Sequence, residues 1–444
     1  MKILLYTNMV PTKEHSTVTY MMWLLTNKFL EIGYEVSFLI PCREGSRTTD
    51  PEFQRHQQEV WSKVGVEIVY FALSHENLLD SEEEYFRSTR FRSKLRNPAY
   101  YKFLLRRLYS RDPSRYFPEI RFRDQLKIQV DTIDPDVIVS FADYGDTFAL
   151  ARAAQCRCLF ILGDLPTESY RMQTALQFAE SQATFKAFQW RRRSYVAGLE
   201  RALLKLMRGE MRWYLTSHHY ADWALSKGVQ AEYIRNIVPD WRRETSLQDT
   251  SQSENERPFT IVMMGHMTGT ATLSGLYHFA YDVLPNLGSM LPDGFEIRIC
   301  GKGTVPADLG EKLSHPNVKM LGFVEDIISE LEAADVFLVP TPLPLGIRVR
   351  IPYVWSLEIC VVAHGANKFG LSELVHDENA LLGNNGEEIA SLLACVASNT
   401  ALRKKIAIGG RKTYDQFYSP SVRIPEFLNL VTEINNDETL IKGA

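Results

Sequence analysis

The segment VFLVPTPLPLGIRVRIPYVWSLEICVVAHG, residues 336–365, contains the pattern that decides the fold. A short apolar run, VFLVP (336–340), predicts a buried strand, and a second run, ICVVAHG (359–365), predicts another after a stretch with helical spacing. Strand, proline-bounded turn, helix and strand form a βαβ unit with parallel strands and a right-handed crossover. We expect the helix of this unit to begin near Gly346, with its first turn facing a cleft.

The same alternation of strands and helices occurs on both sides of a polar segment. Residues 244–258 (ETSLQDTSQSENERP) lack any apolar period, which predicts an interdomain linker. The predicted architecture is therefore α/β, with a Rossmann-like domain at 1–243, a second at 259–418, and a C-terminal stretch, 419–444, that crosses back onto the first. A ligand is expected in the cleft between the carboxyl ends of their strands. The predicted strands are 2–7, 35–41, 66–72, 136–142, 158–163, 259–265, 295–301, 318–324, 336–340 and 359–365, and the predicted helices include 18–32, 273–287, 327–334, 386–398 and 401–416.

Composition sets wide limits on the function. The chain has 444 residues, 45% hydrophobic and 23% charged, with a formal net charge of -4, so its overall charge does not call for nucleic acid. Six cysteines are scattered without zinc-site spacing, which predicts free thiols in a reducing compartment. The opening MKILLYTNMVPTKEH is too short and polar for a signal-peptide core, and no stretch is apolar enough to span a membrane. We therefore expect a cytoplasmic protein.

Two basic stretches, 84–127 and 173–211, interrupt the strand–helix rhythm of the first domain and predict helical insertions. The first of them mixes arginines with tyrosines and phenylalanines and allows three interpretations. The stretch is interpreted either as a solvated helical face, as a binding site for an anionic acceptor such as a lipid-diphosphate-linked glycan, or as a surface that contacts an anionic membrane. On a membrane, each basic residue adds about 1 kcal/mol.

Three polar residues of the first domain follow or flank predicted strand ends, where substrate-binding groups gather in open α/β sheets. These are His15, Asp143 and Asp164. A general base must reach an acceptor hydroxyl within hydrogen-bond distance, and a carboxylate at a strand end meets that requirement. Asp143 and Asp164 are the two preferred candidates, with a purely structural role as the alternative for each.

Five blocks after the linker resemble, in their order and spacing, the group 1 (family four) glycosyltransferases of the GT-B fold. The resemblance covers residues 259–418 and extends only loosely into the first half. It implies two Rossmann-like domains facing one cleft and transfer of a sugar, with retention, from a nucleotide-sugar donor to a hydroxyl of a saccharide or lipid-linked saccharide. The blocks are GHMTGTATLSGLYHFAYDVLP (265–285), ICGKG (299–303), VKMLGFVEDI (318–327), EAADVFLVPT (332–341) and GIRVRIPYVWSLEICVVAHG (346–365).

The resemblance also implies where the donor lies. Arg348 and Arg350 are expected to grip the leaving diphosphate through charge-assisted hydrogen bonds; ordinary surface arginines are the alternative. No bound metal or other cofactor is expected, because protein cations and helix dipoles replace it in such sites. The positions implied for donor binding are Gly265, His266, Thr268, Lys302, Gly322, Phe323, Val324, Gly346, Tyr353 and Glu373.

The sequence departs from the family in its Glu-x7-Glu motif, where Leu345 and Tyr353 replace the two glutamates. The Tyr353 hydroxyl is then expected to take over the contact with the ribose. Two other functions fit this loss: a non-catalytic GT-B partner subunit of another transferase, and a GT-B-fold nucleotide-sugar epimerase. The preferred setting is bacterial-type surface glycan or polysaccharide biosynthesis, with 84–127 as an alternative point of peripheral contact with the inner face of the membrane.

Overall fold

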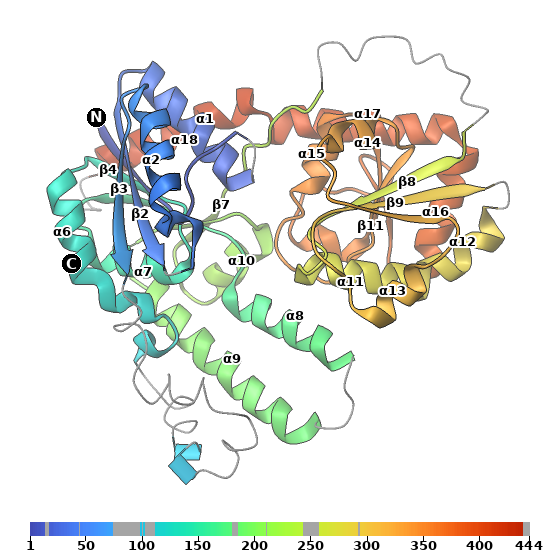
Figure 1. The fold of residues 1–444 in the computed structure, drawn as a ribbon, viewed down its shortest axis with the longest axis horizontal. Helices are drawn as coiled ribbons and strands as arrows, with labels where there is room; N and C mark the ends of the chain where they lie inside the picture. The colour runs from blue at the N-terminus through green and yellow to red at the C-terminus, as the bar shows by residue number, and fades with distance from the viewer. Residues whose placement is uncertain are drawn as a thin grey trace.

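The computed structural model shows two parallel-sheet domains that lie side by side (Figure 1). Met1 and Ile434, near the two ends of the described chain, belong to one hydrophobic cluster of the N-terminal domain. The structure describes residues 1–13, 17–43, 45–73, 98–99, 101–102, 112–179, 185–209, 211–242, 257–291 and 294–437, and it describes no side chains within 173–194.

The N-terminal domain is built on a seven-stranded parallel sheet in the order β3-β2-β1-β4-β5-β6-β7. All four residues of β4 are buried, as expected for a parallel strand covered by helices on both faces. The three-residue strands β6 and β7 have no counterpart among the predicted strands, because so short a run carries no periodic signal. The strands are β1 (Lys2–Tyr6), β2 (Glu35–Arg43), β3 (Glu67–Leu73), β4 (Val137–Ser140), β5 (Arg157–Leu162), β6 (Trp213–Leu215) and β7 (Ala231–Tyr233).

The helices of this domain begin where local sequence favours it. In α2, Pro51 occupies the first turn and the Asp50 carboxylate accepts a hydrogen bond from the amide of Glu52, as at a capped N-terminus. Two long helices, α8 and α9, project from the body of the domain (Figure 1). The helices are α1 (Thr17–Glu31), α2 (Pro51–Ser62), α6 (Arg123–Ile133), α7 (Tyr144–Ala153), α8 (Pro166–Ala179), α9 (Phe185–Met207) and α10 (His218–Ser226), with 3-10 turns at Arg47–Thr49, Pro113–Arg115 and Pro118–Phe122.

The two predicted insertions have different outcomes. Most of 84–127 lies outside the described residues; its described part contains two 3-10 turns and the start of α6. The second basic stretch, 173–211, falls within α8, α9 and the approach to β6, so this insertion is helical as predicted.

The C-terminal domain has a six-stranded parallel sheet in the order β10-β9-β8-β11-β12-β13. The order reverses between β8 and β11, which creates the crevice at the carboxyl ends where ligands bind in doubly wound sheets. The strands are β8 (Phe259–Met264), β9 (Phe295–Cys300), β10 (Val318–Gly322), β11 (Val336–Val339), β12 (Cys360–His364) and β13 (Leu381–Gly383).

Two helices of this domain differ from the sequence-based expectation. The helix expected over 273–287 is divided by a π-helical turn, Phe279–Val283, just before Pro285, which has no amide hydrogen to donate. The helix expected to begin near Gly346 begins at Arg350, because Gly346 has a φ of +52° and cannot join a right-handed helix. The helices are α11 (Thr270–His278), α12 (Leu284–Met290), α13 (Ala307–Leu313), α14 (Ile327–Glu332), α15 (Arg350–Ser356), α16 (Gly386–Ser398), α17 (Thr400–Phe417) and α18 (Pro420–Asn436), with a 3-10 turn at Gly365–Phe369.

The chain returns to the first domain through α18, which packs against β4 and β5. Its apolar face places Phe427, Val431 and Ile434 in the same hydrophobic cluster as the N-terminal sheet. On the other side of the boundary, Arg411 of α17 forms a bidentate pair with Asp240 at 2.9 and 2.7 Å, fixing the segment that leaves the first domain. Residues 243–256, which include most of the predicted linker, lie outside the described part.

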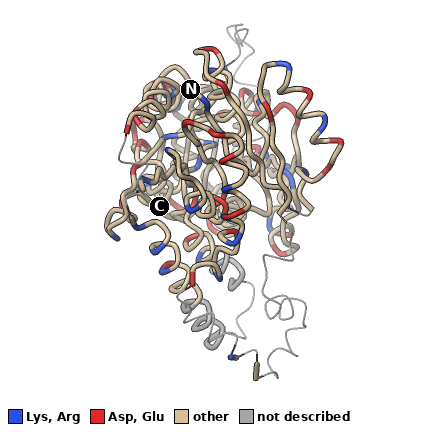
Figure 2. The backbone as a smooth tube through the Cα atoms, turned by 90° about the vertical axis from the view of Figure 1, so that its left-hand side faces the viewer, with Lys and Arg blue, Asp and Glu red and all other residues tan. Residues whose placement is uncertain are grey.

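Charges are mixed along the backbone (Figure 2). Acidic and basic positions are interspersed along the backbone drawn there, in keeping with the formal net charge of -4. In the residues that the structure describes, no helix is both long enough and apolar enough to cross a bilayer.

The crossing of α18 can be tested by removing its largest core side chain. Phe427→Ala should lower the free energy of unfolding of the N-terminal domain by about 3–5 kcal/mol, because the ring is 2% exposed and leaves a cavity. Ile408→Ala on α17, where the side chain is 45% exposed, is the control and should change stability by no more than about 0.5 kcal/mol. Urea unfolding followed by hydrogen exchange locates the loss. Faster exchange confined to β8–β13 would contradict the crossing.

Candidate functional site

The carboxyl ends of the central C-terminal strands meet at one edge of the sheet. Backbone hydrogen bonds tie their loops together: the Gly265 amide donates to the Cys300 carbonyl at 3.0 Å, and the Met267 amide to the Lys302 carbonyl at 2.8 Å. The loops after β8, β9, β10 and β11 thereby bring together most of the residues expected to bind the donor. They are Gly265, His266, Thr268, Lys302, Gly322, Phe323, Val324, Gly346, Arg348 and Arg350.

The outer part of this edge presents polar and aromatic side chains to solvent. His266 and Thr268 are exposed and lie 2.9 Å apart, Nδ1 to Oγ1. The Phe323 side chain is 60% exposed, and the Lys302 ammonium lies 4.2 Å from the centre of its ring. A flat aromatic face beside a cation suits a stacked, electron-rich ring such as a nucleobase.

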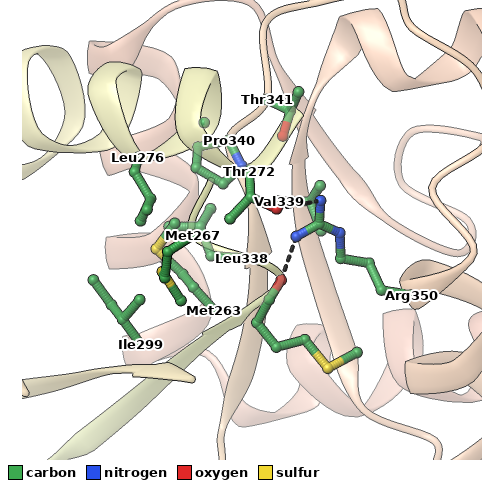
Figure 3. A pocket seen from close by; sticks show the side chains of 12 residues that line it. Met263, Met267, Thr272, Leu276, Ile299, Leu338, Val339, Pro340, Thr341 and Arg350 are labelled. Carbon is green, nitrogen blue, oxygen red and sulfur yellow. Dashed lines mark hydrogen bonds between the residues drawn. The ribbon is translucent and has the colours of Figure 1, made fainter. Parts of the chain in front are cut away.

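Arg350, the first residue of α15, lies at the reversal point between β8 and β11 (Figure 3). Its Nη1 donates to the Met264 carbonyl, and its Nη2 lies 3.4 Å from the Thr272 hydroxyl. A Cβ atom on Gly265 would lie 2.6 Å from that Nη1, so only glycine leaves room for the guanidinium here. Burial, with the nearby charge of Arg348, lowers the pKa of Arg350 to about 9. The cavity beside it, about 10 Å³, holds no more than a single water.

Arg348 lies in the loop before α15 and is 6% exposed. Among the described residues, its Nε and Nη2 have no hydrogen-bond partner. Burial lowers the pKa of Arg348, while the charge of Asp164 and the hydroxyl of Tyr220 oppose the shift. A buried guanidinium that lacks hydrogen-bond partners is costly, and an anion is the ligand that removes the cost.

Tyr220, Asp164 and His219 are residues of the N-terminal domain that reach this loop, and His219 does so at the Pro344 backbone. The Tyr220 hydroxyl of α10 accepts a hydrogen bond from the buried Gly346 amide at 3.0 Å. Asp164, just after β5, lies so close to Gly346 that a Cβ there would be 1.6 Å from its Oδ1. The Asp164 side chain keeps an exposed surface, yet the protein packed around its carboxyl raises its pKa, and Arg348 partly offsets the rise. Sequence reasoning missed Tyr220, because a tyrosine at helical spacing carries no local signal of an interdomain contact.

Asp143 occupies the corresponding reversal point of the N-terminal sheet, between β1 and β4. Its exposed carboxylate accepts a hydrogen bond from Asn8 Nδ2 at 2.7 Å. Beside it lies an ionic group that the sequence analysis missed, in which Arg43 pairs with Asp146 at 2.6 Å and with Glu119 at 3.4 Å. Burial raises the pKa of Asp146 to about 7, with Arg43 opposing the shift. These three residues are far apart in the chain, so no motif links them.

Two residues expected at the donor are bonded to protein groups instead. The Tyr353 hydroxyl lies 3.1 Å from that of Thr17, at the start of α1, and its ring stacks on Trp241 at 4.3 Å. This contact occupies the hydroxyl that was expected to face the ribose.

Glu373 is bonded through both carboxylate oxygens. One oxygen accepts a hydrogen bond from Arg235 Nε at 2.5 Å, and the other accepts a hydrogen bond from the Tyr418 hydroxyl at 2.8 Å. Glu373 and Tyr353 therefore connect the domains in this structure. His15, the other strand-end candidate, lies outside the described residues.

Comparison with known proteins places this site in a family context. Residues 258–399 match the sequence model of the family described as "Glycosyl transferases group 1". No curated protein sequence matches the chain. The predicted resemblance is confirmed for this segment.

Solved structures show the same architecture over both domains. Anabaena Alr3699/HepE in complex with UDP aligns with a TM-score of 0.63 at 12% identity, over 98% of this chain and 100% of its own. A glycosyltransferase from Rickettsia africae ESF-5 gives 0.61 at 12% identity, over 98% and 99%. Sucrose-phosphate synthase (tll1590) from Thermosynechococcus elongatus gives 0.62 at 11% identity, over 98% of both chains. The predicted GT-B fold is confirmed.

The contact between Gly346 and Asp164 yields a prediction on stability. Gly346→Ala should lower the free energy of unfolding by at least about 2 kcal/mol, because a left-handed φ costs an alanine about 1–2 kcal/mol and its methyl group would collide with the Asp164 carboxylate. Gly288→Ala is the matched control. That glycine is exposed in α12 with open space around it, and alanine there should be neutral or stabilise by up to about 1 kcal/mol. Equal effects of the two changes in urea unfolding would disprove the interdomain contact.

Proposed function

We propose, from the premise that residues 258–399 form a group 1 glycosyl transferase domain, that the chain transfers a sugar from a nucleotide-sugar donor to a hydroxyl of a saccharide or lipid-linked saccharide. The observation that carries the proposal is the buried guanidinium of Arg348, whose Nε and Nη2 have no hydrogen-bond partner among the described residues. It lies near Arg350, which is at the reversal point between β8 and β11. A nucleoside diphosphate offers the anionic oxygens that such a pair requires.

The two arginines would act on the leaving group. As the glycosidic bond of the donor breaks, negative charge builds up on the diphosphate, and cations fixed in a water-poor site stabilise it strongly. Arg350 is held by the Met264 carbonyl, so its charge is positioned before the donor arrives. We propose that these charges take the role that a divalent metal has in other transferases, and that turnover proceeds in the presence of EDTA.

The rest of the donor fits the outer edge of the C-terminal sheet. The exposed Phe323 ring with Lys302 above it gives a nucleobase a stacking surface, and the Gly322 backbone lies beside it. HepE, solved in complex with UDP and with UDP-glucose, supports a nucleoside diphosphate donor for this fold.

The acceptor side would be the carboxyl edge of the N-terminal sheet. Asp164 lies directly opposite the loop of Arg348, and Asp143 lies farther along the same edge, so both are placed to meet an acceptor hydroxyl. In a retaining reaction the leaving diphosphate takes the acceptor proton, and the carboxylates orient the acceptor. We propose a role in surface glycan or polysaccharide biosynthesis, in the cytoplasm, with 84–127 as a candidate contact to the inner face of the membrane.

One observation favours a non-catalytic GT-B partner subunit as the second candidate. Of the two positions that carry glutamates in the family, Leu345 is a buried apolar residue and the Tyr353 hydroxyl is paired with Thr17. Such a protein would bind a nucleotide or its partner without turning over any donor.

A nucleotide panel tests the proposal. Thermal shift and calorimetry with UDP, GDP, dTDP and ADP should identify one nucleotide that binds, and Arg348→Gln should weaken its binding at least about 10-fold, the loss of a charge-assisted hydrogen bond. Arg55→Gln, an exposed arginine on α2, is the matched control and should bind normally.

Turnover of the matching nucleotide sugar, with and without EDTA, then separates the two candidates. Hydrolysis or transfer supports an enzyme, whereas binding without turnover of any sugar donor supports the partner subunit. If none of the four nucleotides binds, the proposed function is wrong.

A further inference from the structure

The carboxylate of Asp164 lies across the domain boundary from the loop that carries Arg348. A Cβ atom on Gly346 would lie only 1.6 Å from Asp164 Oδ1, so the carboxylate packs directly on the Gly346 backbone. Arg348 follows two residues later, buried and with Nε and Nη2 unbonded among the described residues. Asp164 is the acidic group whose charge acts on this guanidinium.

Two tyrosines fix the loops that meet at this point. The Tyr220 hydroxyl accepts a hydrogen bond from the Gly346 amide at 3.0 Å and so holds the loop that carries Arg348. Tyr144, the first residue of α7, donates its hydroxyl to the Gly163 carbonyl at 3.2 Å and so holds the residue before Asp164. The carboxylate is therefore kept near the guanidinium by the backbone on either side, and among the described residues it has no hydrogen-bond partner.

We propose that Asp164 is the counter-charge of Arg348 in the ligand-free protein and that the diphosphate of the donor takes its place. This inference rests on the proposed function and adds a step to it, an exchange of anionic partners at one buried arginine. Asp164 lowers the cost of burying Arg348 without saturating its donors, so Nε and Nη2 stay available for phosphate oxygens. The carboxylate becomes free to face the acceptor once the diphosphate has bound.

The exchange has an energetic consequence. A carboxylate and a diphosphate near the same arginine repel each other, so an ionised Asp164 weakens nucleotide binding. Burial already raises the pKa of Asp164, and a second anion raises it further, so binding favours the protonated acid. Among the described residues, the other charged or titratable groups around this point are Arg348, Tyr144 and Tyr220, with Glu168 acting on Tyr220. The His219 ring lies 4.1 Å from that of Tyr220, and burial lowers the pKa of His219.

The sign of the pH effect follows from this. At a pH well above the pKa of Asp164, the wild type carries the repulsive charge and Asp164→Asn does not. As the pH falls, the wild type loses the charge and the two proteins become alike. Titration of the nucleotide phosphate changes the repulsion as well, so the wild type and Asp164→Asn are compared at each pH with the same nucleotide.

Calorimetry with the nucleoside diphosphate that gives the largest thermal shift tests the inference. At pH 8, Asp164→Asn should bind it at least about 5-fold more tightly than the wild type, and the ratio should shrink as the pH is lowered towards the pKa of Asp164. Asp131→Asn, an exposed carboxylate paired with Lys127 on α6, is the matched control and should bind as the wild type does. In an Arg348→Gln background, the gain from Asp164→Asn should be reduced, because the two residues act through one another.

The outcomes separate the inference from the proposed function. Tighter binding by Asp164→Asn with the stated pH trend supports the exchange. If the wild type binds a nucleotide through Arg348 but Asp164→Asn binds equally or more weakly, the exchange is wrong and the proposed function stands. Thermal unfolding of Asp164→Asn confirms that the variant is folded under the conditions of this comparison, and Asp164→Ala serves as the second variant that removes the charge. If the wild type binds no nucleotide, both fail.

Discussion

A guanidinium taken out of water needs negative charge and hydrogen-bond acceptors around it, and the region between the two domains is organised by that requirement at Arg348. The side chain is 6% exposed, yet part of its donor capacity is unused within the described residues. Its surroundings come from both halves of the chain: the loop before α15 supplies the arginine, and β5 and α10 supply Asp164 and Tyr220. Neither domain alone contains the complete site.

The same boundary is held by polar contacts away from the arginines. The Thr17 hydroxyl lies 3.1 Å from the Tyr353 hydroxyl. The Glu373 carboxylate accepts hydrogen bonds from Arg235 and from Tyr418. Each of these pairs satisfies groups that would otherwise be buried without partners, which favours one relative placement of the domains. Tyr353 and Glu373, two positions expected at the donor, are part of the contact between the lobes.

The sequence predicts the sheets well and the site in part. Long apolar runs such as 295–301 are found as strands, and the C-terminal helix 386–398 is found at its predicted bounds, because burial on a sheet imposes a clear period. The strands β6, β7 and β13 are too short to carry that signal. The helix start was misplaced at Gly346, whose backbone conformation is coupled to Asp164 in the other domain. The partners of Tyr353 and Glu373 were beyond reach for the same reason, since tertiary contacts determine them.

The polypeptide passes between the lobes twice, and the two passages are fastened to each other. The Val238 amide donates to the Tyr418 carbonyl at 3.0 Å, and the Tyr414 hydroxyl donates to the Val238 carbonyl at 2.9 Å. Two connections joined at one place leave a single pivot, so any motion of the lobes is a swing about that line and not a free separation. A swing about this line would displace groups near it, such as Trp241 on Tyr353, very little, and would displace α8 and α11, which contact each other away from it, the most.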